Sequence, residues 1–363
     1  MASLGPREVV ELFHAEGVPT YVEAGTGKVF PLSDRAVDVA NALARIVARS
    51  GAVTALGEPV TAIERRLPDA ATGDVAGFRV VTSLRTLTCD KLLVAVGGKS
   101  YSGCGTTGDG YAWLSSLGHS VRRPRPALVP LTSNESWVRE LSGIAMPDTL
   151  LRVVSTEPIA AAETKPRPRR DGRKSLPPGV LIERRSALLF THTGLSGPAA
   201  LDVSREVTKA ADVRSVQLAA DFLPDVAESC SDRTVGTAAE RDGKRLAIGL
   251  VPEVLPRRLA EQVFQQAEVP LERRAAELSK TETQRVAQAI KGLRIPVSGS
   301  RGFEKAEVTA GGVALDEVDS RTMESRLVPG LFLAGEILDL DGYIGGYNFQ
   351  AAFSTGWLAA ESV

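Results

Sequence analysis

Apolar residues recur at helical spacing twice in the first fifty residues of the chain. The first series predicts a short amphipathic helix that ends before Gly17, and a turn at 24–27 follows it. The second series predicts a helix that Ser33 caps and Gly51 ends, because serine favours the N-cap and glycine favours the left-handed position after the last turn. The apolar positions are Val9, Val10 and Phe13 in the first series and Val37, Ala40, Leu43, Ile46 and Val47 in the second.

Strand-like patterns follow these two helices. Short runs rich in β-branched residues predict strands at 52–56, 60–65 and 78–82. The continuous apolar run at 92–96 is typical of a strand that is buried on both faces. From 129 to about 221, short strands are broken by Pro and Gly, which indicates a β-rich domain.

The composition changes again after this β-rich part. Residues 237–295 are rich in Ala, Leu, Glu, Arg and Gln, which favour a small helical subdomain. A buried strand returns at 330–335, so we predict one α/β domain with an insertion. One face of the helix that follows is marked by Phe349, Ala352, Phe353, Gly356, Trp357 and Ala360. The predicted boundaries are 1–128 and 296–363 for the α/β domain, 129–222 for the β-rich domain and 223–295 for the helical subdomain.

Composition and charge exclude several classes of protein. The chain has 363 residues, 43% of them hydrophobic, which is enough for two or three domains. Its 43 Lys and Arg balance 44 Asp and Glu, so we expect a small-molecule substrate rather than nucleic acid or an anionic membrane. No apolar run reaches membrane-spanning length and no signal sequence is found, so we expect a cytoplasmic protein. The spacing of Cys89, Cys104 and Cys230 indicates neither disulfides nor a metal site.

The segment 330–359 has the clearest chemistry. A buried strand ends at Glu336, and the turn at Gly345 and Gly346 leads into the closing helix. These glycines let backbone N–H groups approach a ligand closely, and the helix N-terminus adds roughly half a positive charge. Glu336 is placed like the acid that binds a ribose or ribityl hydroxyl in dinucleotide folds. The alternative is that Glu336 and Asp341 only cap loops.

Four stretches, spread over nearly the whole chain, point to a family. They are KVFPLSDRAVDVANAL from Lys28, LLVAVGGKSYSGCGTTGDGYAWLSSLGHS from Leu92, LLFTHTGLSGPAALDVS from Leu188, and KAEVTAGGVALDEVDSRTMESRLVPGLFLAGEILDLDGYIGGYNFQAAFSTG from Lys305. The chain resembles the BaiN/YhiN-like NAD(P)/FAD-dependent oxidoreductases, also described as aminoacetone oxidase family FAD-binding enzymes. The resemblance implies a Rossmann-like α/β domain that binds FAD and NAD(P), interrupted by a β-barrel-like domain and a helical subdomain.

The resemblance also implies a function and a set of cofactor-binding positions. Hydride would pass between FAD and an unidentified small-molecule substrate, with NAD(P)H as the expected partner of the flavin. The segment 335–348 is expected to lie along the ribityl chain and isoalloxazine, and the segment 106–111 is expected to form a loop beside the flavin. The implied positions are Val60, Gly97, Gly98, Thr107, Gly108, Asp109, Gly335, Glu336, Asp341, Gly345, Gly346, Tyr347, Asn348 and Gln350.

The sequence departs from the family at its start. Family members open with a strand, a GxGxxG turn and a helix, then a strand that ends in an acidic residue, then an Arg-Cys-Asn segment, and this sequence has none of these. Loss of three charge-assisted hydrogen bonds, at about 1.5–3 kcal/mol each, lowers affinity by roughly three to six orders of magnitude. We therefore expect weak or absent FAD binding. The alternative is a truncated or degenerate protein that binds no flavin and acts as a binding or assembly partner.

A second nucleotide site is another possible interpretation of the glycines after residue 100. Gly103, Gly105 and Gly108 spell G-x-G-x-x-G between a predicted strand and a predicted helix, and Arg122 and Arg123 follow, as in NADP-preferring sites. Against this interpretation, the first glycine lies about six residues past the strand, and no acid follows at a distance of roughly twenty residues.

His192 is the best candidate for a catalytic acid–base group, because it lies in a matched stretch at the expected junction of the barrel and the flavin domain. A surface or structural histidine is the alternative at this position. His14 and His119 lie near predicted helix ends and are expected to be structural. No Ser-His-Asp or Cys-His arrangement can be assembled, so the flavin would carry the chemistry and the protein would position it.

Two further features have simple explanations. Cys104 is flanked by glycines, and we expect an exposed but inert thiol. The stretch 163–178 is rich in Pro, Lys and Arg and predicts a flexible loop. Its basic part, 165–174, could contact an anionic partner, but a solvated insertion is the simpler interpretation. The substrate and the oligomeric state cannot be read from the pattern.

Overall fold

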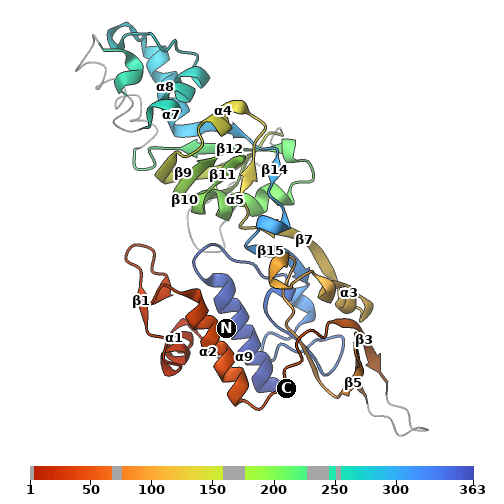
Figure 1. Ribbon diagram of the computed structural model, residues 1–363. Helices are drawn as coiled ribbons and strands as arrows, with labels where there is room; N and C mark the ends of the chain where they lie inside the picture. The colour runs from red at the N-terminus through yellow and green to blue at the C-terminus, as the bar shows by residue number, and fades with distance from the viewer. Residues whose placement is uncertain (1–3, 68–75, 158–175, 227–244, 251–254) are drawn as a thin grey trace. The chain divides into compact units, whose positions relative to one another are not determined.

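The computed structural model describes residues 4–67, 76–157, 176–226, 245–250 and 255–363. The chain forms two compact units (Figure 1): unit 1 contains Met1–Pro124 and Val308–Val363, and unit 2 contains Arg125–Glu307. Cys230 and the basic stretch 165–174 lie outside the described residues, so what the sequence predicts for them stays a prediction.

Unit 1 opens with two helices and a hairpin, which are α1 (Pro6–Ala15), β1 (Thr20–Val22), β2 (Val29–Pro31) and α2 (Ala36–Arg49). Both amphipathic helices and the turn at 24–27 are confirmed. The predicted cap of α2 is wrong, because Arg35 holds the N-cap position and the Ser33 hydroxyl donates to the Asp38 carboxylate over 2.6 Å. Asp34 has a left-handed φ of 53°, so the helix starts only after it.

A three-stranded antiparallel sheet follows, formed by β3 (Val60–Arg66), β4 (Gly77–Thr82) and β5 (Thr86–Cys89). These strands confirm the runs at 60–65 and 78–82. The strand expected at 52–56 does not form: Val53 is 92% exposed and Leu56 is 88% exposed. None of the described residues pairs with this segment, and an extended segment without a neighbouring strand leaves its backbone groups to water.

The centre of unit 1 consists of β6 (Leu92–Val94), α3 (Asp109–Ser116), β7 (Val121–Ala127), β15 (Val308–Val313), β16 (Leu331–Leu333) and α9 (Tyr347–Ser362). β16 pairs parallel to β6, and β15 pairs with β7. β16 is fully buried, as its apolar sequence predicts. β6 is shorter and more open than expected, with Leu93 38% exposed and Val96 44% exposed. Among the described strands only β16 pairs with β6, so β6 is not buried on both faces.

The C-terminal helix α9 does not bury the face that its apolar residues suggest. Phe349 is 75% exposed and Trp357 is 42% exposed, whereas Ser354 and Thr355 are buried. Phe353 does face inward and meets Phe13 of α1 edge-on, with ring centroids 5.7 Å apart. The buried hydroxyls hydrogen-bond to backbone groups of neighbouring segments, so hydrogen bonding decides which side of α9 is buried.

Unit 2 is built on a seven-stranded antiparallel sheet of order β13-β12-β9-β10-β11-β8-β14. The strands are β8 (Leu131–Thr132), β9 (Ala145–Ser155), β10 (Val180–Thr191), β11 (Gly194–Ser196), β12 (Val216–Asp221), β13 (Leu293–Pro296) and β14 (Gly299–Ser300). The helix α5 (Gly197–Lys209) packs against β9 and β10, and α4 (Ser136–Glu140) lies near β10. The β-rich character is confirmed, but the described strands form no closed barrel, because β13 and β14 each have one partner strand.

Helices follow β12 in the chain: α7 (Arg257–Gln266) and α8 (Lys280–Gly292) pack together and agree with the helical composition there. Ser279 caps α8 by accepting the Glu282 N–H. Short 3₁₀ turns complete both units: Ser102–Cys104, Val213–Ser215, Ala247–Leu250, Ala275–Glu277, Phe303–Lys305, Leu315–Glu317 and Gly335–Ile337.

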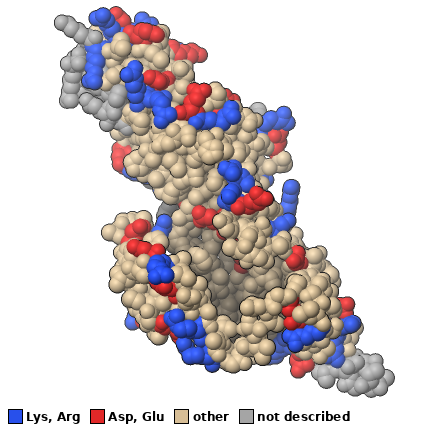
Figure 2. All heavy atoms as spheres, in the orientation of Figure 1, with Lys and Arg blue, Asp and Glu red and all other residues tan. Residues whose placement is uncertain are grey.

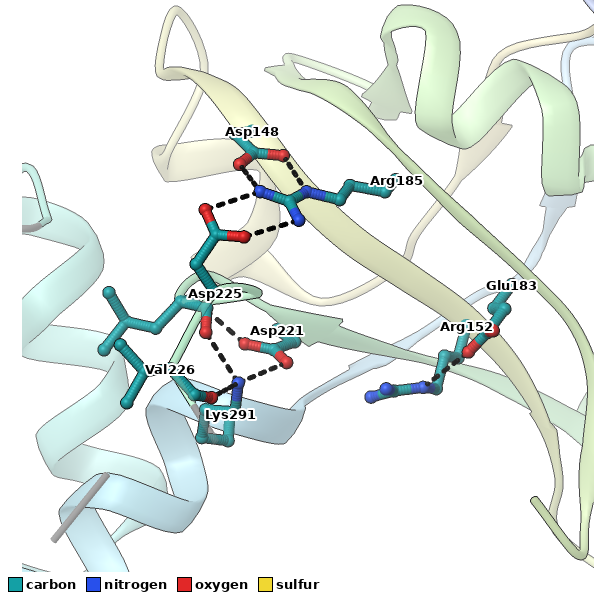
Figure 3. Close-up of polar contacts among 9 residues, drawn as sticks. Asp148, Arg152, Glu183, Arg185, Asp221, Asp225, Val226 and Lys291 are labelled. Carbon is teal, nitrogen blue, oxygen red and sulfur yellow. Dashed lines mark hydrogen bonds and ion pairs between the residues drawn. The ribbon is translucent and has the colours of Figure 1, made fainter. Parts of the chain in front are cut away.

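A polar network ties α8 to the sheet of unit 2 (Figure 3). The Lys291 ammonium donates to Asp221 over 2.7 Å and to the carbonyls of Leu223 and Val226 over 2.6 and 2.7 Å. All three of its hydrogens are therefore used, and the Asp221 side chain is only 4% exposed. Beside this group, Arg185 of β10 forms ion pairs with the carboxylates of Asp148 and Asp225.

Removal of the buried cation should destabilise unit 2 strongly. We expect Lys291→Met to lower the free energy of unfolding by about 3–5 kcal/mol, because the buried Asp221 carboxylate loses its counter-ion. The control is Lys209→Met, which breaks an exposed pair with Glu206 and should cost less than about 1 kcal/mol. Denaturant unfolding of both variants is the measurement, and equal losses would contradict the role of Lys291.

Candidate functional site

Three segments that are distant in the sequence meet at the carboxyl ends of β6 and β16 in unit 1. They are the turn at 97–100 after β6, Thr309 in β15, and Glu336 just after β16. The Thr309 N–H donates to the Glu336 carboxylate over 2.5 Å. The N–H groups of Lys99 and Ser100 donate to the Thr309 hydroxyl oxygen over 2.8 and 3.1 Å. Thr309 therefore connects the end of one parallel strand to the end of the other.

The Glu336 carboxylate is largely buried in this cluster. Burial raises its pKa, hydrogen bonds from Thr309 and from the Gly98 backbone oppose that rise, and the nearby Asp341 carboxylate adds to it. Glu336 thus holds loops together, which was one of the two roles that the sequence left open. A carboxylate has about four acceptor positions, so these donors leave capacity for a ligand hydroxyl.

The turn after β6 needs glycine because it passes close to β15. A Cβ at Gly98 would lie 2.5 Å from the Thr309 hydroxyl oxygen and 3.2 Å from the Glu336 carboxyl carbon. Gly97 has a φ of 73°, which side chains other than glycine rarely adopt. Both predicted positions therefore lie beside Glu336.

The turn into α9 has open space at its end. Gly346 is the N-cap of α9, with a φ of 85°, and a Cβ there would meet nothing within 4 Å. The helix has no capping side chain and no acidic residue in its first turn, where an acid would balance its positive end. Tyr347 is 62% exposed beside it. In the lower part of Figure 2 the surface of unit 1 is hollowed, and mainly uncharged side chains line the hollow.

Several predicted cofactor ligands use their polar atoms inside the chain. Both polar atoms of the Asn348 side chain bond to the Gly342 backbone. The Gln350 amide donates to the Leu4 carbonyl over 3.0 Å and to the Ser354 hydroxyl over 2.9 Å. The N–H of Gly335 donates to Thr355 over 2.9 Å. These polar atoms therefore support the turn at Gly345 and Gly346 through contacts within the chain. The sequence pattern did not indicate this role.

The segment 106–111 also lies close to this cluster. The Thr106 hydroxyl donates to the Gly98 carbonyl over 2.6 Å. The Thr107 hydroxyl donates to the Asp109 carboxylate over 2.7 Å, and Gly108 is the left-handed N-cap of α3. Thr106 thus contacts the turn after β6, and the predicted positions Thr107, Gly108 and Asp109 come directly after it in the chain. Val60 lies at the start of β3 and packs against the core of unit 1.

The second-nucleotide interpretation of Gly103, Gly105 and Gly108 is wrong. A dinucleotide unit needs two parallel strands of one sheet around the helix. Here β6 pairs with β16 whereas β7 pairs with β15, and a 3₁₀ turn at Ser102–Cys104 precedes α3. Arg122 lies near the start of β7 rather than at its end, and it pairs with Asp339.

The histidines lie in separate surroundings. His192 is exposed in the two-residue turn between β10 and β11 of unit 2, so its catalytic role stays a prediction. His119 is buried, with Nδ1 2.9 Å from the Glu317 carboxylate and Nε2 2.9 Å from the Ser325 hydroxyl. His14 bonds to Thr20 over 2.8 Å. The latter two histidines are structural, as expected.

The sequence analysis missed Thr309 and Thr355. Both are buried hydroxyls in apolar surroundings, and each bonds to a predicted site residue. An isolated polar residue within a buried strand, as in VTAGGV, is the signal that could have identified Thr309. The described residues contain no cluster of metal ligands. No helix in the described parts of the chain is long and apolar enough to cross a membrane.

Residues 1–362 match the HI0933-like protein Rossmann domain family. The chain belongs to this family. The match confirms both the Rossmann-like α/β class and the resemblance to BaiN/YhiN-like FAD-dependent oxidoreductases.

Three curated relatives illustrate the range of the family. The chain is 32% identical over 293 residues to the ribosomal RNA dihydrouridine synthase of Escherichia coli (strain K12), covering 80% of this chain and 64% of that protein. It is 30% identical to the ribosomal RNA dihydrouridine synthase of Haemophilus influenzae, covering 98% of this chain and 79% of the relative. It is 27% identical to the 3-dehydro-bile acid delta(4,6)-reductase of Clostridium scindens, covering 100% of this chain and 81% of the relative.

The Thr309 hydroxyl can be tested by an isosteric change. We expect Thr309→Val to lower the free energy of unfolding by at least about 1–3 kcal/mol, because the N–H groups of Lys99 and Ser100 lose their acceptor in a buried place. Thr61→Val, at an exposed position of β3, is the matched control and should change stability by about 0.5 kcal/mol or less. If denaturant unfolding gave the same value for both variants, Thr309 would not connect the strands.

The raised pKa of Glu336 predicts a pH dependence of stability. A carboxyl whose pKa is raised by folding stabilises the fold fully below its ordinary pKa of 4.5 and loses this contribution as pH rises through the folded-state pKa. Relative to Glu336→Gln, the native protein should therefore gain stability as pH falls from neutral towards 4.5. The measurement is the unfolding free energy of both proteins across that range. If the native protein instead became more stable relative to Glu336→Gln as pH rises from 4.5 to neutral, the assignment would be wrong.

Proposed function

We propose that this protein is a flavin-dependent oxidoreductase whose unit 1 binds FAD, with the weak affinity expected of a sequence that does not open with the family's GxGxxG turn. The observation that carries the proposal is the cluster at the carboxyl ends of β6 and β16, where Gly98, Thr309 and Glu336 meet in a chain of a Rossmann family. In open α/β sheets, ligands bind outside the carboxyl ends of the strands. The family match over 1–362 favours this function over that of a degenerate binding partner.

The residues present fit a flavin at this place. Gly345 and Gly346 have no side chains, and the positive end of α9 suits an electron-rich group. Glu336 keeps acceptor capacity for a ribityl hydroxyl. Thr107 and Asp109, with Val60 and Tyr347, complete the set of proposed contacts. A flavin held by these residues would supply the hydride for the substrate, and NAD(P)H would be the source of the electrons on the flavin.

The names of the relatives suggest which bond is reduced. Dihydrouridine is uridine whose ring double bond is saturated, and a delta(4,6)-reductase saturates carbon–carbon double bonds. Both reactions add one hydride and one proton across a double bond that is conjugated with a carbonyl group. We propose the same reaction class here: a carbon–carbon double bond is reduced, NAD(P)H is oxidised, and solvent supplies the proton.

The names of two relatives make RNA uridine the first candidate substrate, in place of the small molecule that the overall charge balance predicts. The near-zero total charge conceals a difference between the units: residues 125–307 carry 28 Lys and Arg against 24 Asp and Glu. Unit 1 carries 15 against 20. Basic groups attract a phosphate backbone, and two of the relatives named above act on ribosomal RNA. A small conjugated ketone is the second candidate, favoured by the relative that matches over the whole chain.

Two assays with the purified chain separate these candidates. The protein is incubated with FAD, NADPH and either unmodified ribosomal RNA or a 3-oxo-delta(4,6) steroid. Dihydrouridine in the digested RNA supports the first candidate, and loss of the conjugated chromophore of the steroid supports the second. FAD-independent NADPH oxidation, or no reduction of either substrate together with no FAD binding, would refute the proposed function.

Glycine at position 346 should matter for FAD beyond its effect on folding. Gly346 and Gly51 both have positive φ, 85° and 77°, and both face open space, so alanine strains the backbone equally at either position. We expect Gly346→Ala to weaken FAD binding at least about tenfold more than Gly51→Ala, at equal loss of stability. Flavin fluorescence titration and thermal unfolding provide the two readouts. Equal FAD affinities in the two variants would mean that the turn at Gly345 and Gly346 has only a structural role.

A further inference from the structure

Asn348 closes the loop that leads into α9. Its Oδ1 accepts the N–H of Gly342 over 2.8 Å, and its Nδ2 donates to the carbonyl of the same glycine over 3.2 Å. One side-chain amide thus pairs with one backbone residue through both of its polar atoms. The pair joins the two ends of the segment 342–348, which contains Gly345 and Gly346.

The loop between these ends is packed by its own tyrosine. A Cβ at Gly342 would lie 2.7 Å from the Tyr347 Cβ, and a Cβ at Gly345 would lie 3.1 Å from the Tyr347 ring. Glycine at these two positions therefore lets Tyr347 lie against the loop. Tyr347 thus contacts the loop while staying 62% exposed, and the pairing of the two ends closes the segment.

Hydrogen bonds also hold the start of α9 from the other side. The Gln350 N–H donates to the Gly346 carbonyl over 2.9 Å. The Gln350 amide and the Ser354 hydroxyl both donate to the Leu4 carbonyl, over 3.0 and 2.7 Å. The helix start is thus attached to the buried Leu4, and the turn at Gly345 and Gly346 lies within the segment that the Asn348–Gly342 pair closes.

We propose that Asn348 is a positioning residue: it presets the Gly345–Gly346 turn for the cofactor through its pair with Gly342, and does not itself contact the cofactor. That the cofactor is FAD rests on the proposed function. The Asn348–Gly342 pair is observed independently of it. A preset turn binds its ligand with less loss of conformational freedom than a loose one.

The pairing has a chemical signature that a cofactor contact would lack. Neutral aspartic acid can reproduce it, because its carbonyl oxygen accepts the Gly342 N–H and its O–H donates to the Gly342 carbonyl. Ionised aspartate cannot, since it places a negative oxygen against that carbonyl. In Asn348→Asp the Gly342 carbonyl disfavours the ionised side chain, whereas the positive end of α9 favours it. The full pairing should therefore be lost at neutral pH, where the acid is ionised, and should return once the acid is protonated, below the ordinary aspartate pKa of about 3.9.

The first experiment uses the chain without FAD. Amide hydrogen exchange of the segment 341–347 is compared with the native protein at each pH. We expect exchange to be about tenfold faster in Asn348→Ala at every pH. Asn348→Asp should match Asn348→Ala at neutral pH and approach the native rate only as pH falls below about 4. Phe349→Ala, at a 75% exposed neighbour, is the control and should exchange at the native rate. Native exchange in Asn348→Ala would overturn the proposal.

The second experiment measures FAD affinity of the same proteins at neutral pH. We expect Asn348→Ala and Asn348→Asp to bind about tenfold more weakly than the native protein and Phe349→Ala. Weaker binding without faster exchange would mean that Asn348 contacts the cofactor, and the positioning role would be wrong. If even the native protein bound no FAD, the proposed function would fail, while the exchange result would still decide whether Asn348 sets the turn.

Discussion

Buried N–H groups at the ends of strands need acceptors, and the centre of unit 1 is arranged to provide them. The turn after β6 directs the N–H groups of Lys99 and Ser100 at the Thr309 hydroxyl, and Thr309 in turn donates its own N–H to Glu336. Each such donor left unpaired would cost about 1–3 kcal/mol. The carboxylate that closes this chain of bonds also lies where a Rossmann fold binds its ligand, so the same interaction supports the fold and the proposed site.

The C-terminal helix follows the same logic. Thr355 accepts the N–H of Gly335, Ser354 donates to Leu4, and Asn348 pairs with Gly342. These polar contacts set how α9 is rotated, and the aromatic ring of Phe349 is exposed as a consequence. The turn at Gly345 and Gly346 is therefore fixed by Asn348 and Gln350, whose polar side-chain atoms bond within the protein. The position of a Cβ at Gly346 is open space.

The two units differ in their charge and in their sheets. By sequence, unit 1 carries more acidic than basic residues, whereas unit 2 carries more basic than acidic residues and contains the seven-stranded antiparallel sheet. The curated relatives named above differ in substrate: two are named for ribosomal RNA and one for a bile acid.

Periodicity and glycine placement alone determined a large part of this protein. They gave α1, α2, the buried strand β16 and the Gly345–Gly346 turn, and the matched stretches gave the family. Tertiary structure decided the rest, because hydrogen-bond partners are chosen across the chain: Ser100 and Thr309 are 209 residues apart. For the same reason 52–56 has strand-like sequence but no strand, and Asn348 bonds to Gly342 although its position suggested a ligand contact. The local sequence pattern indicates which secondary structure a segment can form. Which backbone groups find hydrogen-bond partners depends on the segments that the fold places beside it.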